Sequence, residues 1–137
     1  MVLEMRGMAQ GIKAVHVHES GKCEAPDFAT AGGHLNPDGK RHGLLNPAGP
    51  HSGDLPNISI GSDGTGRLET MNERLALRAG TALLDSDGSA LVVHAAADDF
   101  TTDPAGGSGA RIACGLIVKS RAGPEAPVAA PARTPAR

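Results

Sequence analysis

His16-Val-His18-Glu-Ser-Gly-Lys-Cys23 is the stretch that decides how the rest of this 137-residue sequence is interpreted. Successive side chains on a β-strand alternate faces, so His16 and His18 would point the same way, about 6.7 Å apart along the strand. Two imidazoles at that spacing can hold one cation, although a His-x-His pair on its own is more often two surface histidines. The stretch therefore predicts a strand that is a candidate for metal binding.

The other four histidines stand in short motifs further along the chain. The motifs are Gly33-His34-Leu-Asn-Pro37, His42-Gly-Leu-Leu-Asn-Pro47, His51-Ser-Gly-Asp54-Leu-Pro-Asn57 and Leu91-Val-Val-His94, and Arg111-Ile-Ala-Cys114-Gly115 follows them. The sequence contains six histidines, so its entire stock of imidazole lies in these motifs. This concentration indicates a chain built around metal.

The composition indicates a single all-β domain. The sequence has 137 residues, a length that supports one domain, and its aromatic residues are only Phe28 and Phe100, so the core must be aliphatic. Nineteen glycines and ten prolines favour a loop-rich β fold over a helical one. The net charge of −2 implies no general attraction to nucleic acid or to an anionic membrane. No stretch is long and apolar enough to cross a membrane.

The hydrophobic pattern predicts short strands separated by two long loops. Strands are expected at residues 2–6, 12–18, 57–60, 67–71, 90–94 and 111–118. Residues 72–78 are expected to be an irregular connection rather than a helix. The loops are residues 19–53 and 95–110, and so long a loop inside a compact domain needs a reason, which metal ligation supplies. Residues 121–137 are rich in proline and alanine and are expected to be a disordered tail after a domain spanning residues 1–120.

These motifs make the chain resemble the Cu/Zn superoxide dismutases, in particular the bacterial type, from about Gly7 to Val118. The resemblance implies a Greek-key β-barrel or sandwich with two long functional loops. Aligned by motif, the chain begins inside the third of the family's eight strands. It is therefore expected to form about six strands, with a gap where the first two would lie.

The resemblance also implies the ligands of two metals. His16, His18, His34 and His94 would bind copper, and imidazole nitrogen suits Cu(II). His34, His42, His51 and Asp54 would bind zinc in a closed tetrahedral arrangement. His34 would bridge both metals as an imidazolate, which two cations bound to one ring make possible.

The implied activity is dismutation of superoxide to dioxygen and hydrogen peroxide, with His34 supplying a proton to the product. Arg111 would draw the superoxide anion towards copper, and the alternative is a solvated arginine at the start of a strand. Asp98 would link His16 to His42 and orient both rings, and the alternative is a solvated carboxylate in a loop.

Cys23 and Cys114 are the only cysteines. They could be two unrelated buried thiols, and the resemblance implies instead that they form a disulfide. A disulfide and the family together imply a periplasmic or extracellular location, although the start of the chain shows no signal peptide.

Two departures from the family pattern raise specific questions. Lys13-Ala14-Val15 stands where relatives usually carry His-Gly-Phe, which puts the packing of the barrel in question. The loop Pro104-Ala-Gly-Gly-Ser-Gly109 lacks an asparagine that is common among relatives, which puts the order of that loop in question.

Three functions are compatible with the sequence: an active dismutase, a truncated copper- or zinc-binding protein without useful turnover, and a pseudo-enzyme with a structural or interaction role. The third is the weakest, because no ligand is missing. The unpaired edges beside the missing strands predict either low stability or self-association into a homo-oligomer through the gap.

Overall fold

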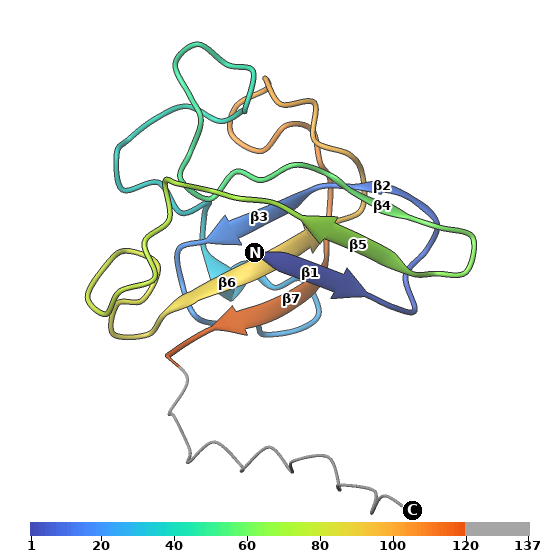
Figure 1. Cartoon of the computed structure of the whole chain (residues 1–137), viewed down its shortest axis with the longest axis horizontal. Helices are drawn as coiled ribbons and strands as arrows, with labels where there is room; N and C mark the ends of the chain where they lie inside the picture. Colours follow the sequence, from blue (N-terminus) through green and yellow to red (C-terminus); the bar gives the residue numbers. More distant parts are fainter. Residues whose placement is uncertain (120–137) are drawn as a thin grey trace, which may run out of the picture.

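The computed structural model describes residues 1–119 and consists of seven short strands and one turn of 3-10 helix, η1. Figure 1 shows their arrangement. The elements in chain order are β1 (Val2–Met5), β2 (Gly11–Lys13), β3 (Val15–His18), η1 (Ala29–Ala31), β4 (Ile58–Ile60), β5 (Gly66–Glu69), β6 (Ser89–His94) and β7 (Arg111–Ile117). The predicted all-β class is confirmed. The expected disordered tail at residues 121–137, and the domain boundary at 120, lie outside the described residues.

The strands form two antiparallel sheets. One has the order β1-β5-β4-β2 and the other the order β3-β6-β7. An aliphatic cluster packs between them, drawn from both sheets and the connections, and it includes Val15, Leu55, Ile58 and Val93. None of the helical segments in residues 1–119 has the length and hydropathy for a membrane crossing.

The expected single strand over residues 12–18 is wrong in one respect, because it breaks at Ala14. Lys13 pairs with Ile58 in the first sheet, whereas Val15 pairs with Val93 in the second. Between them, the Ala14 N–H donates to the carbonyl of Ala96 and the Ala14 carbonyl accepts from the N–H of His94. The chain therefore passes from one sheet to the other at this residue, which explains why β2 and β3 are two strands.

The altered Lys13-Ala14-Val15 segment is well packed. Ala14 and Val15 are fully buried, and the Lys13 ammonium donates to the carbonyl oxygen of Ala95 at 2.7 Å. This segment is thus held by a small aliphatic core and by a contact to the second long loop.

The two long loops lie together at one end of the molecule, drawn in teal and orange in Figure 1. The Leu45 N–H donates to the Phe100 carbonyl, and the His42 N–H donates to the Asp103 carboxylate at 2.7 Å. Because these contacts join residues about sixty positions apart, the first loop is fixed against the second. Residues 72–78, expected to be an irregular connection, contain neither helix nor strand.

The opposite end is open between β1 and β7. Each is the terminal strand of its sheet, and within residues 1–119 no strand pairs with its outer edge. Next to Met1, which precedes β1, and Ile117, which ends β7, lies an apolar hollow of about 330 Å³. It is lined by Met1, Val17, Leu55, Asn72, Leu75, Leu77, Leu83 and Ile117. The expected gap in the barrel is therefore present in the described structure.

Candidate metal centre

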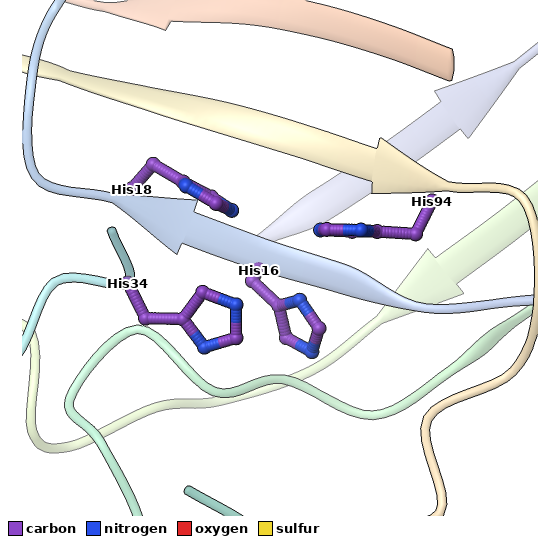
Figure 2. A group of neighbouring side chains, drawn as sticks. All are labelled: His16, His18, His34 and His94. Atoms are coloured by element: carbon purple, nitrogen blue, oxygen red, sulfur yellow. The ribbon is translucent and has the colours of Figure 1, made fainter. Parts of the chain in front are cut away.

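Four histidine rings from three different segments converge beside β3 (Figure 2). His16 and His18 lie on β3 with ring centroids 6.4 Å apart, His94 ends β6, and a single β-bridge to His18 holds His34 in place. Each ring has one buried nitrogen without a hydrogen-bond partner: Nδ1 of His16 and Nε2 of His18, His34 and His94. One ligand atom from each ring lies within 4.8 Å of the others, so this first group could hold one metal ion.

In three of these rings, the second nitrogen makes a hydrogen bond. That bond fixes the direction in which the nitrogen without a partner points. His18 Nδ1 donates to the Gly32 carbonyl at 2.9 Å, and His94 Nδ1 donates to the Gly109 carbonyl at 3.1 Å. His16 Nε2 donates to the Asp98 carboxylate at 2.7 Å. Since an acceptor takes the proton on one nitrogen, the other nitrogen keeps a lone pair available to a metal.

A second group surrounds Asp54. Its Oδ1 lies 3.1 Å from His34 Nδ1, 3.1 Å from His42 Nδ1 and 3.4 Å from His51 Nδ1, and the His34 and His51 nitrogens are 3.2 Å apart. Four ligands at zinc-binding distance occupy tetrahedral corners separated by about 3.3 Å. These distances are compatible with one zinc-sized ion. The four ligand atoms near Asp54 that all lie within 4.8 Å of one another, however, are those of His16, His34, His42 and Asp54, without His51.

His16 also approaches this second group, since its ligand atom lies within 4.8 Å of those of His34, His42 and Asp54. Its two nitrogens, however, face the first group and Asp98, respectively. His51 instead directs Nδ1 at His34 and Asp54. His34 is thus the ring shared by both groups, with Nε2 towards the first and Nδ1 towards the second.

Asp98 joins the two groups from behind. Its carboxylate accepts from His16 Nε2 at 2.7 Å and from His42 Nε2 at 2.9 Å, and it is almost wholly buried. Although burial would raise the pKa of this carboxyl, the hydrogen bonds from both histidines hold it well below its usual range. Asp98 therefore remains an anion that orients one ring of each group.

Asn57 is a supporting residue that sequence reasoning missed. Its side-chain oxygen accepts from the Asp98 N–H at 2.9 Å, and its amide donates to the Asp98 carbonyl at 3.0 Å. This pair of bonds fixes the backbone of Asp98 across 41 residues of sequence. Its only sequence signal was its place three residues after Asp54.

The protonation of the cluster follows from burial and from the two carboxylates. Burial lowers the pKa of His18 to about 3 and of His34 to about 4, and it also lowers those of His16 and His94. For His42, hydrogen bonds to Asp54 and Asp98 outweigh burial and raise the pKa to about 9. The first group is thus neutral and ready for a metal, because no proton has to be displaced.

Arg111 stands at the start of β7 with its guanidinium bound to the first long loop. It donates to the carbonyl of Phe28 at 2.8 Å and to that of Gly32 at 2.7 Å. Gly32 is also the acceptor for His18, and the Arg111 charge is one of the factors that lower the pKa of His18 and His94. The structure therefore fixes this cation close to the first group.

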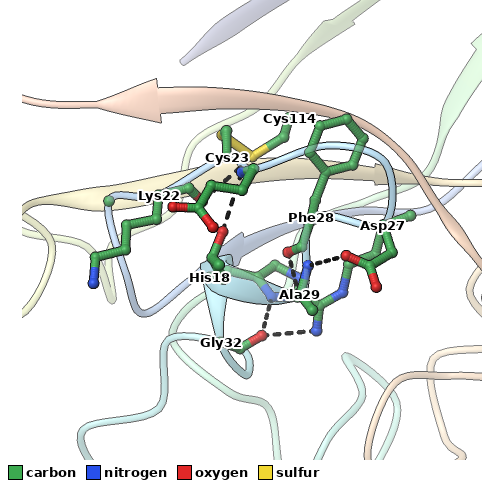
Figure 3. Close-up of a disulfide and its surroundings, with 12 residues drawn as sticks. His18, Lys22, Cys23, Asp27, Phe28, Ala29, Gly32 and Cys114 are labelled. Atoms are coloured by element: carbon green, nitrogen blue, oxygen red, sulfur yellow. Dashed lines mark hydrogen bonds between the residues drawn. A yellow bond between two sulfur atoms is a disulfide. The ribbon is translucent and has the colours of Figure 1, made fainter.

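The predicted disulfide between Cys23 and Cys114 is confirmed, with Cα atoms 5.6 Å apart (Figure 3). It ties the first long loop to β7, and the cysteines pack with Ala31, Ala90 and Val92 in a small cluster. Phe28 lies beside the bridge in Figure 3. The strand that carries Arg111 and the loop that supplies its acceptors are thus joined covalently.

Comparison with known proteins gives a consistent result. The family model described as copper/zinc superoxide dismutase matches residues 1–117. The chain is 50% identical over 106 residues to superoxide dismutase [Cu-Zn] 1 of Aquifex aeolicus, an alignment that covers 76% of this chain and 63% of that protein. It is 48% identical over 119 residues to superoxide dismutase [Cu-Zn] of Caulobacter vibrioides, covering 84% of this chain and 68% of the relative.

Solved structures agree on the fold. The crystal structure of a SOD-like protein from Bacillus subtilis superimposes with a TM-score of 0.80 and 42% identity, covering 84% of this chain and 78% of that one. The chain spans less than two thirds of the length of the two Aquifex aeolicus relatives, 63% and 62%.

Proposed function

Because this chain belongs to the copper/zinc superoxide dismutase family, we propose that it converts two superoxide anions and two protons into dioxygen and hydrogen peroxide. The observation that carries the proposal is the set of four buried imidazole nitrogens without partners that face one another. Leaving four such groups unpaired would be costly without a ligand, so the site fits a metal that accepts nitrogen ligands.

We assign the first group to copper and the second to zinc. His16, His18, His34 and His94 would hold copper, which supplies the one-electron oxidation and reduction that dismutation requires. His34, His42, His51 and Asp54 would hold zinc, which fixes His34 in place. Whenever His34 Nε2 is not bound to copper, it could take up a proton from solvent and pass it to the peroxide product, because Nδ1 stays engaged with the second group.

Arg111 would attract the substrate. Superoxide is a small anion, and a fixed guanidinium beside the first group raises its local concentration. The two carbonyls that hold Arg111 take up some of its N–H donors and keep the planar group in one orientation.

The test is the decay of superoxide, measured by pulse radiolysis with the chain loaded with copper and zinc. The loaded chain should accelerate decay, and Arg111→Ala should slow it about tenfold and flatten its dependence on ionic strength. Arg78→Ala is the matched control, since Arg78 makes no side-chain hydrogen bond within residues 1–119. Metal binding without accelerated decay would favour the alternative, a copper- and zinc-binding protein without turnover.

We also propose that two copies of the chain associate through the gap between β1 and β7. The support is a pair of open strand edges with exposed apolar side chains, among them Val2 and Leu116, beside the apolar hollow. Sedimentation of the metal-free, reduced chain should show dimers that Leu116→Lys abolishes. Leu45→Lys, at an exposed leucine in the first long loop, should leave them unchanged. A monomer before any substitution would contradict the proposal.

For location, we propose the periplasm or the extracellular space. The proposal is supported by the disulfide, because such bonds persist in oxidising compartments. Fractionation of the source cells, with trapping of free thiols, tests it. The chain should be found outside the cytoplasm with no free thiol, and a cytoplasmic, reduced chain would refute it.

A further inference from the structure

The connection from residue 72 to 84 carries no histidine, yet it contacts the turn that carries His51 and Asp54. The Asn72 side-chain amide donates to the Ser52 carbonyl at 2.9 Å. The Arg74 guanidinium donates to the Asp54 carbonyl at 3.0 Å. Two neighbouring side chains of one segment thus bind alternate carbonyls of the turn.

These two side chains form one unit. The Asn72 side-chain oxygen accepts from the Arg74 N–H at 3.0 Å, so the residue that binds Ser52 also shapes the backbone from which Arg74 extends. Ser52 and Asp54 are almost fully buried, at 3% and 1% exposed. Removing either donor would leave a buried carbonyl without this partner, which is costly.

Asp54 is held at all of its oxygens. Its Oδ1 faces the three histidines of the second group, and its Oδ2 accepts the backbone N–H groups of Gly43 and His51, each at 2.9 Å. Its carbonyl accepts from Arg74. Within the described residues, Arg74 is thus the one charged side chain other than the histidines that hydrogen-bonds to Asp54.

From these contacts we propose that Asn72 and Arg74 are positioning residues for the second metal group, which keep the 51–54 turn in its ligating shape and slow the release of zinc. The inference rests on the proposed zinc assignment. The 51–54 turn is bonded to β3 through Gly53, but β3 is also paired along its length with β6, so loosening the turn should free copper much less than zinc.

The test follows the loss of each metal from the loaded chain after addition of a chelator, with zinc and copper measured separately. Arg74→Ala and Asn72→Ala should speed zinc release about tenfold, in the range seen for residues that support metal ligands, and leave copper release within about twofold. Arg74→Lys keeps a charged donor, so it should release zinc more slowly than Arg74→Ala and faster than the unmodified chain. Arg78→Ala, in the same segment, should behave like the unmodified chain.

Cobalt(II) in place of zinc gives a second readout, because its visible absorption reports ligand geometry. The spectrum should change in Arg74→Ala and not in Arg78→Ala. If Arg74→Ala fails to fold, Arg74→Lys and Asn72→Ala test the same point.

Zinc release from Arg74→Ala at the rate of Arg78→Ala, or copper lost as fast as zinc, would overturn the inference while leaving the proposed function standing. If Arg74→Ala releases zinc faster than the unmodified chain, but the unmodified chain does not dismutate superoxide, only the proposed function is refuted.

Discussion

The two ends of this molecule differ in how completely they are held together. At the loop end, His16, His42, Asp54 and Asp98 are all buried, and each is bonded to residues distant in sequence. At the other end, Val2 is 53% exposed and Leu116 55% exposed, on strands whose outer edges have no partner within residues 1–119. The order of the candidate metal centre therefore comes from its own polar network rather than from a closed barrel.

One covalent link joins the two ends. Cys114 lies on β7, the open edge, and Cys23 lies in the first long loop near Gly32 and Phe28. If the polar network alone orders the loop end, a substitution at the open strand edges should lower the stability of the whole chain. It should change the geometry around the histidines much less. Three perturbations test this, in order of expected size.

The largest effect should come from replacing both Cys23 and Cys114 by serine. The bridge spans 91 residues, and closing a loop of that size stabilises a folded chain by about 4–5 kcal/mol through the entropy of the unfolded state. Urea unfolding of the metal-loaded variant should show this loss, while its copper spectrum stays close to that of the unmodified chain. A spectrum that changes with little loss of stability would show that the bridge serves the metal centre and not the open edge.

A smaller effect is expected from Gly106→Ala, which strikes the loop end alone. Gly106 has φ +66°, and a Cβ there would overlap the Asp98 carboxylate and lie 2.8 Å from His42 Nε2. Displacing Asp98 should weaken metal binding about tenfold or more, as measured by competition with a chelator.

Gly107→Ala is the matched control for Gly106→Ala. Gly107 has nearly the same backbone conformation, φ +64°, but the nearest atom to its Cβ would be 4.0 Å away. Both variants carry the strain of a left-handed alanine, so only the difference between them reports on Asp98. Equal metal affinity in the two variants would contradict the role given to Asp98.

The mildest perturbation is a pH change of about one unit around neutrality in the metal-free chain. Folding lowers the pKa values of His18 and His34 from 6.5, so below that pH the unfolded chain binds more protons and stability falls. Folding raises the pKa of His42 to about 9, so above 6.5 the folded chain keeps a proton that the unfolded chain loses, and stability falls again.

The melting temperature of the metal-free chain should therefore be highest near pH 6.5. It should fall more steeply on the acid side, where His16 and His94 act in the same direction as His18 and His34. His42→Gln should remove the alkaline decline. A melting temperature that rises steadily from pH 6 to 9 would contradict this assignment of charges.

The sequence predicted the two ends unequally. The histidine motifs and the cysteine pair could be predicted because each lies in a short ordered pattern. The structure brings His16, His18, His34 and His94 together. The break at Ala14 was not predicted, although the alternation of apolar and polar residues shifts there, where Ala14 and Val15 follow one another. It depends on hydrogen bonds to His94 and Ala96, about eighty residues away.

The supporting residues were also beyond the sequence. Asn57 and Arg74 hydrogen-bond to backbone groups, and Gly106 is needed because a side chain there would collide with Asp98. None of them is a metal ligand, so no pattern of ligand types marks them. Asp98 was predicted only by resemblance, since a carboxylate in a loop has no periodicity that would distinguish it from a solvated one.

The measurement that tests the central claim most directly is a metal titration of the metal-free, disulfide-bonded 137-residue chain. The claim is that the loop end forms a complete two-metal centre despite the open edge. The account predicts one copper and one zinc bound per chain, with a copper spectrum that changes when the neighbouring zinc is replaced by cobalt(II), as a shared His34 requires. A single metal equivalent, or two metals whose spectra are independent of each other, would contradict it.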